Sequence, residues 1–135
     1  MTETNPTEFP FPSDGKRYYT WNRYLRDEFG CKVYKVALDA GFDCPNRDGT
    51  VAFGGCTFCS AAGSGDFAGD RVDPIPVQFA TIKERMQHKW KDGKTMAYFQ
   101  AYTNTHAPLP VLKEKFEAAL ACEGVMGLSI ATRPD

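Results

Sequence analysis

The chain has 135 residues, of which 42% are hydrophobic and 24% charged, and its formal net charge is −1. These values are typical of a globular domain with its own core, and they exclude the strongly basic composition of a general nucleic-acid binder. No apolar stretch is long enough to span a bilayer, and the N-terminus lacks the basic and apolar regions of a secretory signal. We therefore expect a cytoplasmic protein with no membrane partner.

The first 15 residues are rich in proline and are predicted to form an extended arm. Residues 16–135 are predicted to form the domain itself. Its first element is a short amphipathic helix within residues 16–30, with Thr20 or Asn22 as its cap and Gly30 as its end. The apolar stripe of this helix is expected to consist of Trp21, Tyr24, Leu25 and Phe29.

Strands and helices are expected to alternate through the rest of the domain. Three segments rich in β-branched and aromatic residues predict strands: 31–40, 95–102 and 125–131. Prolines introduce two predicted helices between them, at 77–91 and from Pro108 to a stop at Gly124. Their buried stripes are expected to be Phe79, Ile82, Met86 and Trp90 in the first helix, and Leu112, Phe116 and Leu120 in the second.

The βαβαβ order predicts an α/β fold in which parallel strands are covered by helices, either a barrel or a doubly wound sheet. In both architectures ligands bind at the carboxyl ends of the strands. Three loops should meet there: residues 44–59, 103–107 and 132–135. The sequence stops directly after the third strand, which leaves open sheet edges. We expect the chain to be the N-terminal part of a longer protein and to be unstable or inactive alone.

The loop after the first strand carries Cys44, Cys56 and Cys59 in the spacing C-x11-C-x2-C, amid several glycines. Without a secretion signal, cysteines favour metal or redox chemistry over disulfides. A [4Fe–4S] cluster has four ligand positions, so three thiolates would leave one iron open. Structural zinc also takes four ligands, and His106 could supply the fourth. The remaining cysteines, Cys31 and Cys122, are expected to be small buried hydrophobic side chains.

Several motifs resemble the radical S-adenosylmethionine (SAM) superfamily, in particular its Elp3-related branch and the YhcC/YtqA-like group within it. The cysteine loop after a first strand, with an aromatic residue before the last cysteine, is the general likeness. The expanded spacing differs from the commoner C-x3-C-x2-C. The specific motifs begin at Trp21 (WNRY), Asp39 (DAGF), Cys44 (CPNRDG), Gly55 (GCTFCS) and Ala131 (ATRPD).

The resemblance implies that the chain is the N-terminal half of a partial (βα)6 barrel. It implies that Cys44, Cys56 and Cys59 bind a [4Fe–4S] cluster and that SAM binds the fourth iron. An electron donor would reduce the cluster, and SAM would then be cleaved to methionine and a 5′-deoxyadenosyl radical. Contacts to SAM are expected from the side chains of Phe58, Thr103, Asn104, Ser129 and Arg133.

The same resemblance makes tRNA the expected substrate, with modification at the wobble uridine. The basic and aromatic helix at 16–30 is the one local feature that agrees with RNA binding. A small molecule or a protein is the alternative substrate. From a different class of function, a zinc-dependent binding module built from the three cysteines and His106 is a further alternative. No catalytic side chain is assigned from the sequence.

Overall fold

The computed structural model describes residues 15–134, so the predicted N-terminal arm lies almost entirely outside the described residues. Helices and strands follow the predicted order, and each contains fewer residues than predicted. They are α1 (Trp21–Phe29), β1 (Val33–Leu38), α2 (Ile75–Gln87), β2 (Lys94–Phe99), α3 (Leu109–Leu120) and β3 (Val125–Ile130). A long segment without helix or strand separates β1 from α2, and it contains the cysteine loop.

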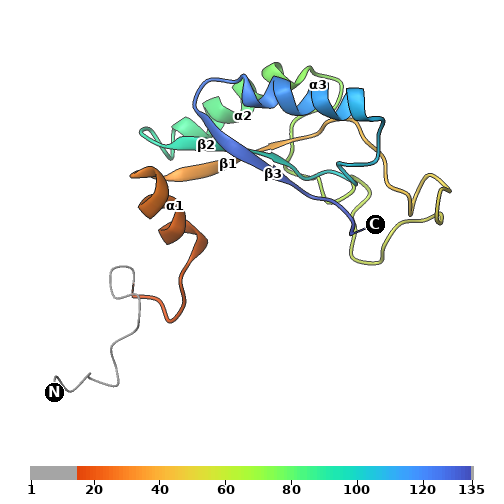
Figure 1. Ribbon diagram of the computed structural model, residues 1–135, viewed down its shortest axis with the longest axis horizontal. Helices are drawn as coiled ribbons and strands as arrows, with labels where there is room; N and C mark the ends of the chain where they lie inside the picture. The colour runs from red at the N-terminus through yellow and green to blue at the C-terminus, as the bar shows by residue number, and fades with distance from the viewer. Residues whose placement is uncertain (1–14, 135) are drawn as a thin grey trace.

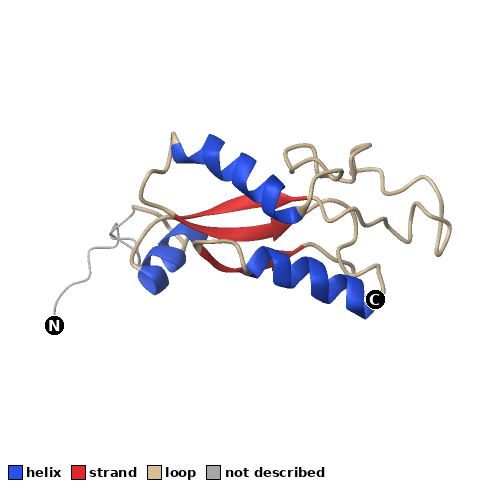
Figure 2. Ribbon diagram, turned by 90° about the horizontal axis from the view of Figure 1, so that it is seen from above, coloured by secondary structure: helices blue, strands red, loops and turns tan. Residues whose placement is uncertain are grey.

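The three strands form one parallel sheet in the order β1-β2-β3. In the register, Val36 pairs with Ala97 and Ala97 pairs with Leu128. Helices α2 and α3 lie side by side over the same face of this sheet (Figures 1 and 2). The prediction of an α/β fold with parallel strands is therefore confirmed.

The core lies between this sheet face and the two helices. Alternate strand residues point into it, among them Val36, Leu38, Ala97 and Phe99, each fully buried. The ring of Phe116 on α3 meets Phe99 edge-on, with the centroids 5.2 Å apart. The predicted stripes of α2 and α3 are confirmed except at Leu120, whose side chain is half exposed because Ala119 takes the inward position at the end of α3.

Helix α2 begins two residues before the predicted start and ends four residues before the predicted stop. The early start is possible because Pro76 lies in the first turn, where a backbone N–H has no partner within the helix. Trp90 still packs against the core, but it does so from the turn after the helix.

Helix α1 begins after Thr20, whose hydroxyl accepts the N–H of Arg23, and it ends at Gly30 in the left-handed conformation. Its predicted apolar stripe is wrong in part, because Leu25 is buried while Trp21 and Tyr24 are exposed and stack on each other. The reason is visible in Figure 1: α1 lies beyond the amino end of β1 and covers neither face of the sheet. Across residues 15–134, no helix combines the length and the apolar character needed to cross a membrane.

Candidate functional site

Loops that follow the three strands meet at the carboxyl end of the sheet and enclose a cavity of about 280 Å³. The thiols of Cys44, Cys56 and Cys59 all line it, and we call it the thiol cavity. Phe58, Thr103 and Arg133 line it as well, so residues from all three strand-end loops share one site. The convergence predicted from the βαβαβ order is therefore confirmed for these side chains.

A polar side chain lies within hydrogen-bond distance of each of the three sulfur atoms. The Thr103 hydroxyl donates to Cys44 Sγ over 3.2 Å, and Asn46 Nδ2 donates to Cys56 Sγ over 3.3 Å. The Ser64 hydroxyl lies 3.2 Å from Cys59 Sγ. Hydrogen bonds of this kind stabilise negative charge on sulfur, such as that of a metal-bound thiolate.

Two arginines hold the cysteine loop in place. Arg133, which follows β3, donates from Nη1 to Asn46 Oδ1 over 2.8 Å. Arg47 donates to the backbone carbonyls of Ser60 and Ala61, which follow the last two cysteines in the sequence. Because both contacts join segments far apart in the sequence, the loop is fixed to the sheet and to itself without regular secondary structure.

Tyr102, a wall residue that follows β2, has the left-handed backbone conformation, with φ of 63°. Its ring makes cation–π contacts with the guanidinium groups of Arg47 and Arg71, which lie 5.2 and 4.8 Å from the ring centroid. Its hydroxyl donates to the carbonyl of Ala61. Gly63 passes directly beneath the ring, where an added Cβ would lie 2.6 Å from ring carbons. Tyr102 therefore fixes one wall of the cavity by close packing.

A Gly63→Ala variant is expected to destabilise the protein by about 2–4 kcal/mol, because left-handed strain and overpacking against Tyr102 add together. Gly41→Ala is the matched control. Gly41 is also left-handed, with φ of 79°, but a Cβ there would meet nothing within 4 Å. The control should cost only the strain, about 1–2 kcal/mol, in urea unfolding. Equal losses in the two variants would contradict the packing role of Tyr102.

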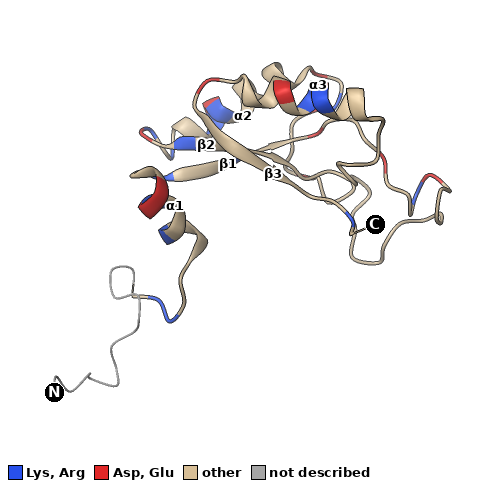
Figure 3. Ribbon diagram, viewed as in Figure 1, with Lys and Arg blue, Asp and Glu red and all other residues tan. Residues whose placement is uncertain are grey.

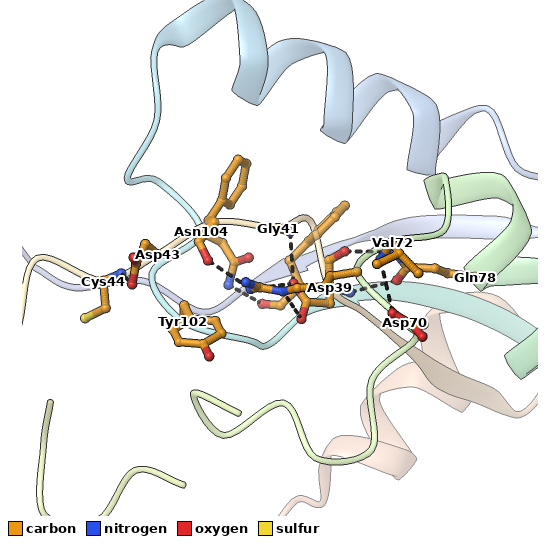
Figure 4. Close-up of polar contacts among 12 residues, drawn as sticks. Asp39, Gly41, Asp43, Cys44, Asp70, Val72, Gln78, Tyr102 and Asn104 are labelled. Atoms are coloured by element: carbon orange, nitrogen blue, oxygen red, sulfur yellow. Dashed lines mark hydrogen bonds and ion pairs between the residues drawn. The ribbon is translucent and has the colours of Figure 1, made fainter. Parts of the chain in front are cut away.

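A second network anchors the chain as it leaves β1, and Figure 4 shows Asp39 at its centre. The buried Gln78 of α2 accepts the backbone N–H of Asp39 and donates to its carbonyl and to that of Asp73. The Asp39 carboxylate accepts from Arg71 at 3.2 Å and from the N–H of Gly41 at 2.9 Å. The start of the cysteine loop is thus bound to the core of the domain.

Two predicted site residues lie away from the thiol cavity. Asn104 is fully buried, and its Nδ2 donates to the carbonyls of Phe99 and Ala131, which joins the ends of β2 and β3. Its Oδ1 has no hydrogen-bond partner among the described residues. Ser129 pairs with Tyr98 in the sheet and is not part of the cavity lining.

His106 also lies apart from the cysteines. Its Nε2 is 2.6 Å from the carboxylate of Asp48, and it lines a neighbouring cavity of about 200 Å³. The pKa of Asp48 is lowered to about 2, first by hydrogen bonds from Thr50 and then by His106. His106 thus ties its loop to the cysteine loop through Asp48, and Thr103 is the residue that both cavities share.

Cys31 and Cys122 are half-buried and do not line the thiol cavity. Burial raises the pKa of the Cys122 thiol, which donates to the carbonyl of Ala118. A thiol with a raised pKa is a poor metal ligand at neutral pH.

A metal ion in a protein is held by several donor side chains that converge on one point. Among residues 15–134, no three His, Cys, Asp or Glu side chains converge closely enough to hold a single metal ion as they stand. The three thiols instead lie around the wall of one cavity, each beside its own polar side chain. Thiolates are the ligands of iron–sulfur clusters, and hydrogen bonds to their sulfurs are typical of such sites. The donor types on this wall are therefore those that iron–sulfur clusters take.

Similar proteins exist in bacteria and archaea. The chain is 67% identical over its full length to Uncharacterized protein YtqA of Bacillus subtilis and covers 41% of that protein. It is 40% identical over 115 residues to Protein YhcC of Escherichia coli, covering 35% of it. It is 34% identical over 133 residues to Uncharacterized protein MJ0486 of Methanocaldococcus jannaschii, covering 37%. The chain thus spans about two-fifths of the length of these relatives.

Those names state no activity. No protein-family model and no solved structure matches the chain.

Proposed function

We propose that this chain forms the cluster-binding part of a radical SAM enzyme. The observation that carries the proposal is the arrangement of Cys44, Cys56 and Cys59, which line one cavity at the carboxyl end of a parallel sheet. Three thiolate ligands suit a [4Fe–4S] cluster in which one iron remains open. When bound, the cluster and SAM together supply a one-electron reductive cleavage of SAM and, from it, a radical that abstracts hydrogen.

The remaining wall offers contacts suited to SAM. Phe58 is 86% exposed although it lines the cavity, so its ring is available to pack against an adenine. Arg133 brings a guanidinium to the same wall, where a carboxylate can be held. We assign these two residues to SAM. The hydroxyl of Thr103 is directed to a sulfur instead, and neither Asn104 nor Ser129 reaches the wall.

The winding of the chain favours a barrel over a doubly wound sheet. Strands β1, β2 and β3 follow one another in sequence order, and both crossover helices cover the same face. In a barrel, each new strand is added on the same side and all helices lie outside; a doubly wound sheet reverses order and carries helices on both faces. We therefore propose that these strands open a partial (βα)6 barrel, which longer relatives would continue.

For the substrate we propose tRNA, modified at the wobble uridine, on the strength of the sequence motifs alone. Charge adds no support, because Figure 3 shows both signs on α1, α2 and α3 in the view drawn. The exposed, stacked pair Trp21 and Tyr24 on α1 is a surface on which a base could stack. A small molecule or a protein is the alternative substrate. Whatever the substrate, an external one-electron donor would reduce the cluster.

The test is reductive cleavage of SAM by the full-length protein. After anaerobic reconstitution and reduction with dithionite, we expect 5′-deoxyadenosine and methionine to form in equal amounts. A Cys59→Ser variant should fall to background, whereas Cys122→Ser, which alters a thiol outside the cavity, should retain the wild-type rate. Absence of both products from an iron-loaded wild-type protein would overturn the proposal.

The same assay separates the substrate classes. A true substrate should be modified in proportion to the SAM consumed. Unmodified tRNA is added in one arm, and a small-molecule or peptide extract in the other. Nucleoside analysis that finds a new modified uridine in the tRNA arm would support tRNA. If modification occurred only in the other arm, the proposal of tRNA as the substrate would be wrong. The proposal of a radical SAM reaction would still stand.

A further inference from the structure

The hydrogen-bond partners of the three sulfurs come from separate parts of the chain. Thr103 follows β2, Asn46 lies inside the cysteine loop and Ser64 follows that loop. Each contacts a different sulfur, at 3.2, 3.3 and 3.2 Å. On the basis of the proposed function, we propose that Thr103, Asn46 and Ser64 are positioning residues. They orient the three thiolates and raise the reduction potential of the cluster. Arg133 acts through Asn46.

The direction of each hydrogen bond follows from the chemistry of the groups. Arginine has donors and no acceptor, so the atom of Asn46 that faces Arg133 must be Oδ1. The amide Nδ2 of Asn46 is then turned toward Cys56 Sγ and can only donate. At Cys59 either atom could donate while the sulfur is a thiol. A thiolate has no proton, so in the ligated form the Ser64 hydroxyl donates.

Neighbouring backbone and side-chain groups hold Thr103 and Asn46 in place beside their sulfurs. Thr103 is 6% exposed, and its backbone N–H donates to the carbonyl of Asp43, which fixes the residue beside Cys44. Asn46 is half-buried and held at its other end by Arg133. These contacts hold the two side chains beside their sulfurs, so each donor is already oriented.

Reduction adds an electron to the cluster, and part of that charge resides on the thiolate sulfurs. A donor aimed at a sulfur therefore stabilises the reduced state more than the oxidised one, and removing the donor lowers the potential. The positively charged Arg133, in contact with Oδ1, polarises the amide of Asn46 in the same sense. We expect the potential to fall in every variant that loses a donor.

The experiment is a redox titration of the full-length reconstituted protein without SAM, followed by the EPR signal of the reduced cluster. Thr103→Val should lower the ratio of reduced to oxidised cluster about tenfold at a fixed potential, which corresponds to about 59 mV for one electron. Thr103→Ser keeps the hydroxyl and should titrate like the wild type. Thr105→Val is the matched control, because Thr105 contacts Thr132 and no sulfur.

Two further variants test the other sulfurs. Asn46→Leu and Ser64→Gly should each shift the titration in the same direction; glycine is chosen because Ser64 has φ of 65°, in the left-handed region. Wild-type titrations in Asn46→Leu and Ser64→Gly would overturn the inference whatever Thr103→Val does. A wild-type protein that binds no iron would instead overturn the proposed function, so the two failures are distinguishable.

Discussion

Cys56→Ser is expected to remove the cluster from the protein. Cys56 lines the thiol cavity with Cys44 and Cys59, and on the proposed function these three thiolates are the protein's whole ligand set. Loss of a hydrogen-bond partner behind a ligand costs roughly 10–100-fold in metal affinity, and loss of the ligand itself should cost more. Iron and sulfide bound after anaerobic reconstitution should therefore fall at least about tenfold.

Cys31→Ser provides the matched control for this change. Cys31 is half-buried like Cys56, but it precedes β1 at the opposite end of the sheet and does not line the cavity. The control should bind as much iron as the wild type. A Cys56→Ser protein with a normal cluster spectrum would mean that the ligand assignment is wrong.

Gln78→Leu is expected to destabilise the protein by about 3 kcal/mol or more. The Gln78 side chain is 2% exposed and bonds to three backbone groups, the N–H and carbonyl of Asp39 and the carbonyl of Asp73. Leucine fills a similar volume and satisfies none of them. An unpaired polar group costs about 1–3 kcal/mol when buried, and because these three bonds are part-buried we expect the lower end for each. Urea unfolding of the metal-free protein measures the loss.

Gln87→Leu, at the exposed end of the same helix, is the control and should change stability by no more than about 0.5 kcal/mol. The comparison isolates burial and hydrogen bonding from the change of residue type. If Gln78→Leu were as stable as Gln87→Leu, the anchoring of the cysteine loop to α2 through Asp39 would be refuted.

The alternation of strands and helices was predictable because each element carries its own periodic pattern and its own stop. The prolines before α2 and α3 and the glycines at 30 and 124 mark element ends, and buried strand residues such as Val36 and Phe99 confirm the apolar runs. Errors occurred where burial depends on neighbours far away in sequence. Trp21 and Tyr24 have helical spacing, but nothing local indicates that α1 lies off the end of the sheet.

The candidate site divides in the same way. The three cysteines were predictable from thiol spacing in a glycine-rich loop, and the rule for parallel strands placed Thr103 and Arg133 at the same edge. Asn104 was expected at the cofactor because it is polar and follows β2. The structure shows that its carboxamide instead joins two strand ends inside the protein. Residue type and position could not distinguish a contact with a cofactor from a hydrogen bond between two strand ends.

Two of the three hydrogen-bond partners of the sulfurs, Asn46 and Ser64, were not predicted. Asn46 and Ser64 occur in loops that contain many small polar residues. No spacing pattern shows which of those residues will donate a hydrogen bond to a sulfur. Tyr102 was not predicted either, because its left-handed backbone and its contacts with two arginines depend on the folded loop. Such residues become visible only when segments separated by many residues are brought together.

The central claim is that Cys44, Cys56 and Cys59 hold an iron–sulfur cluster with one iron open to SAM. The most direct measurement is iron, sulfide and zinc content after anaerobic reconstitution, followed by EPR of the reduced protein before and after addition of SAM. We predict about four iron and four sulfide per chain, little zinc, and an EPR signal that SAM changes. Stoichiometric zinc without iron, or a cluster signal that SAM leaves unchanged, would contradict the claim.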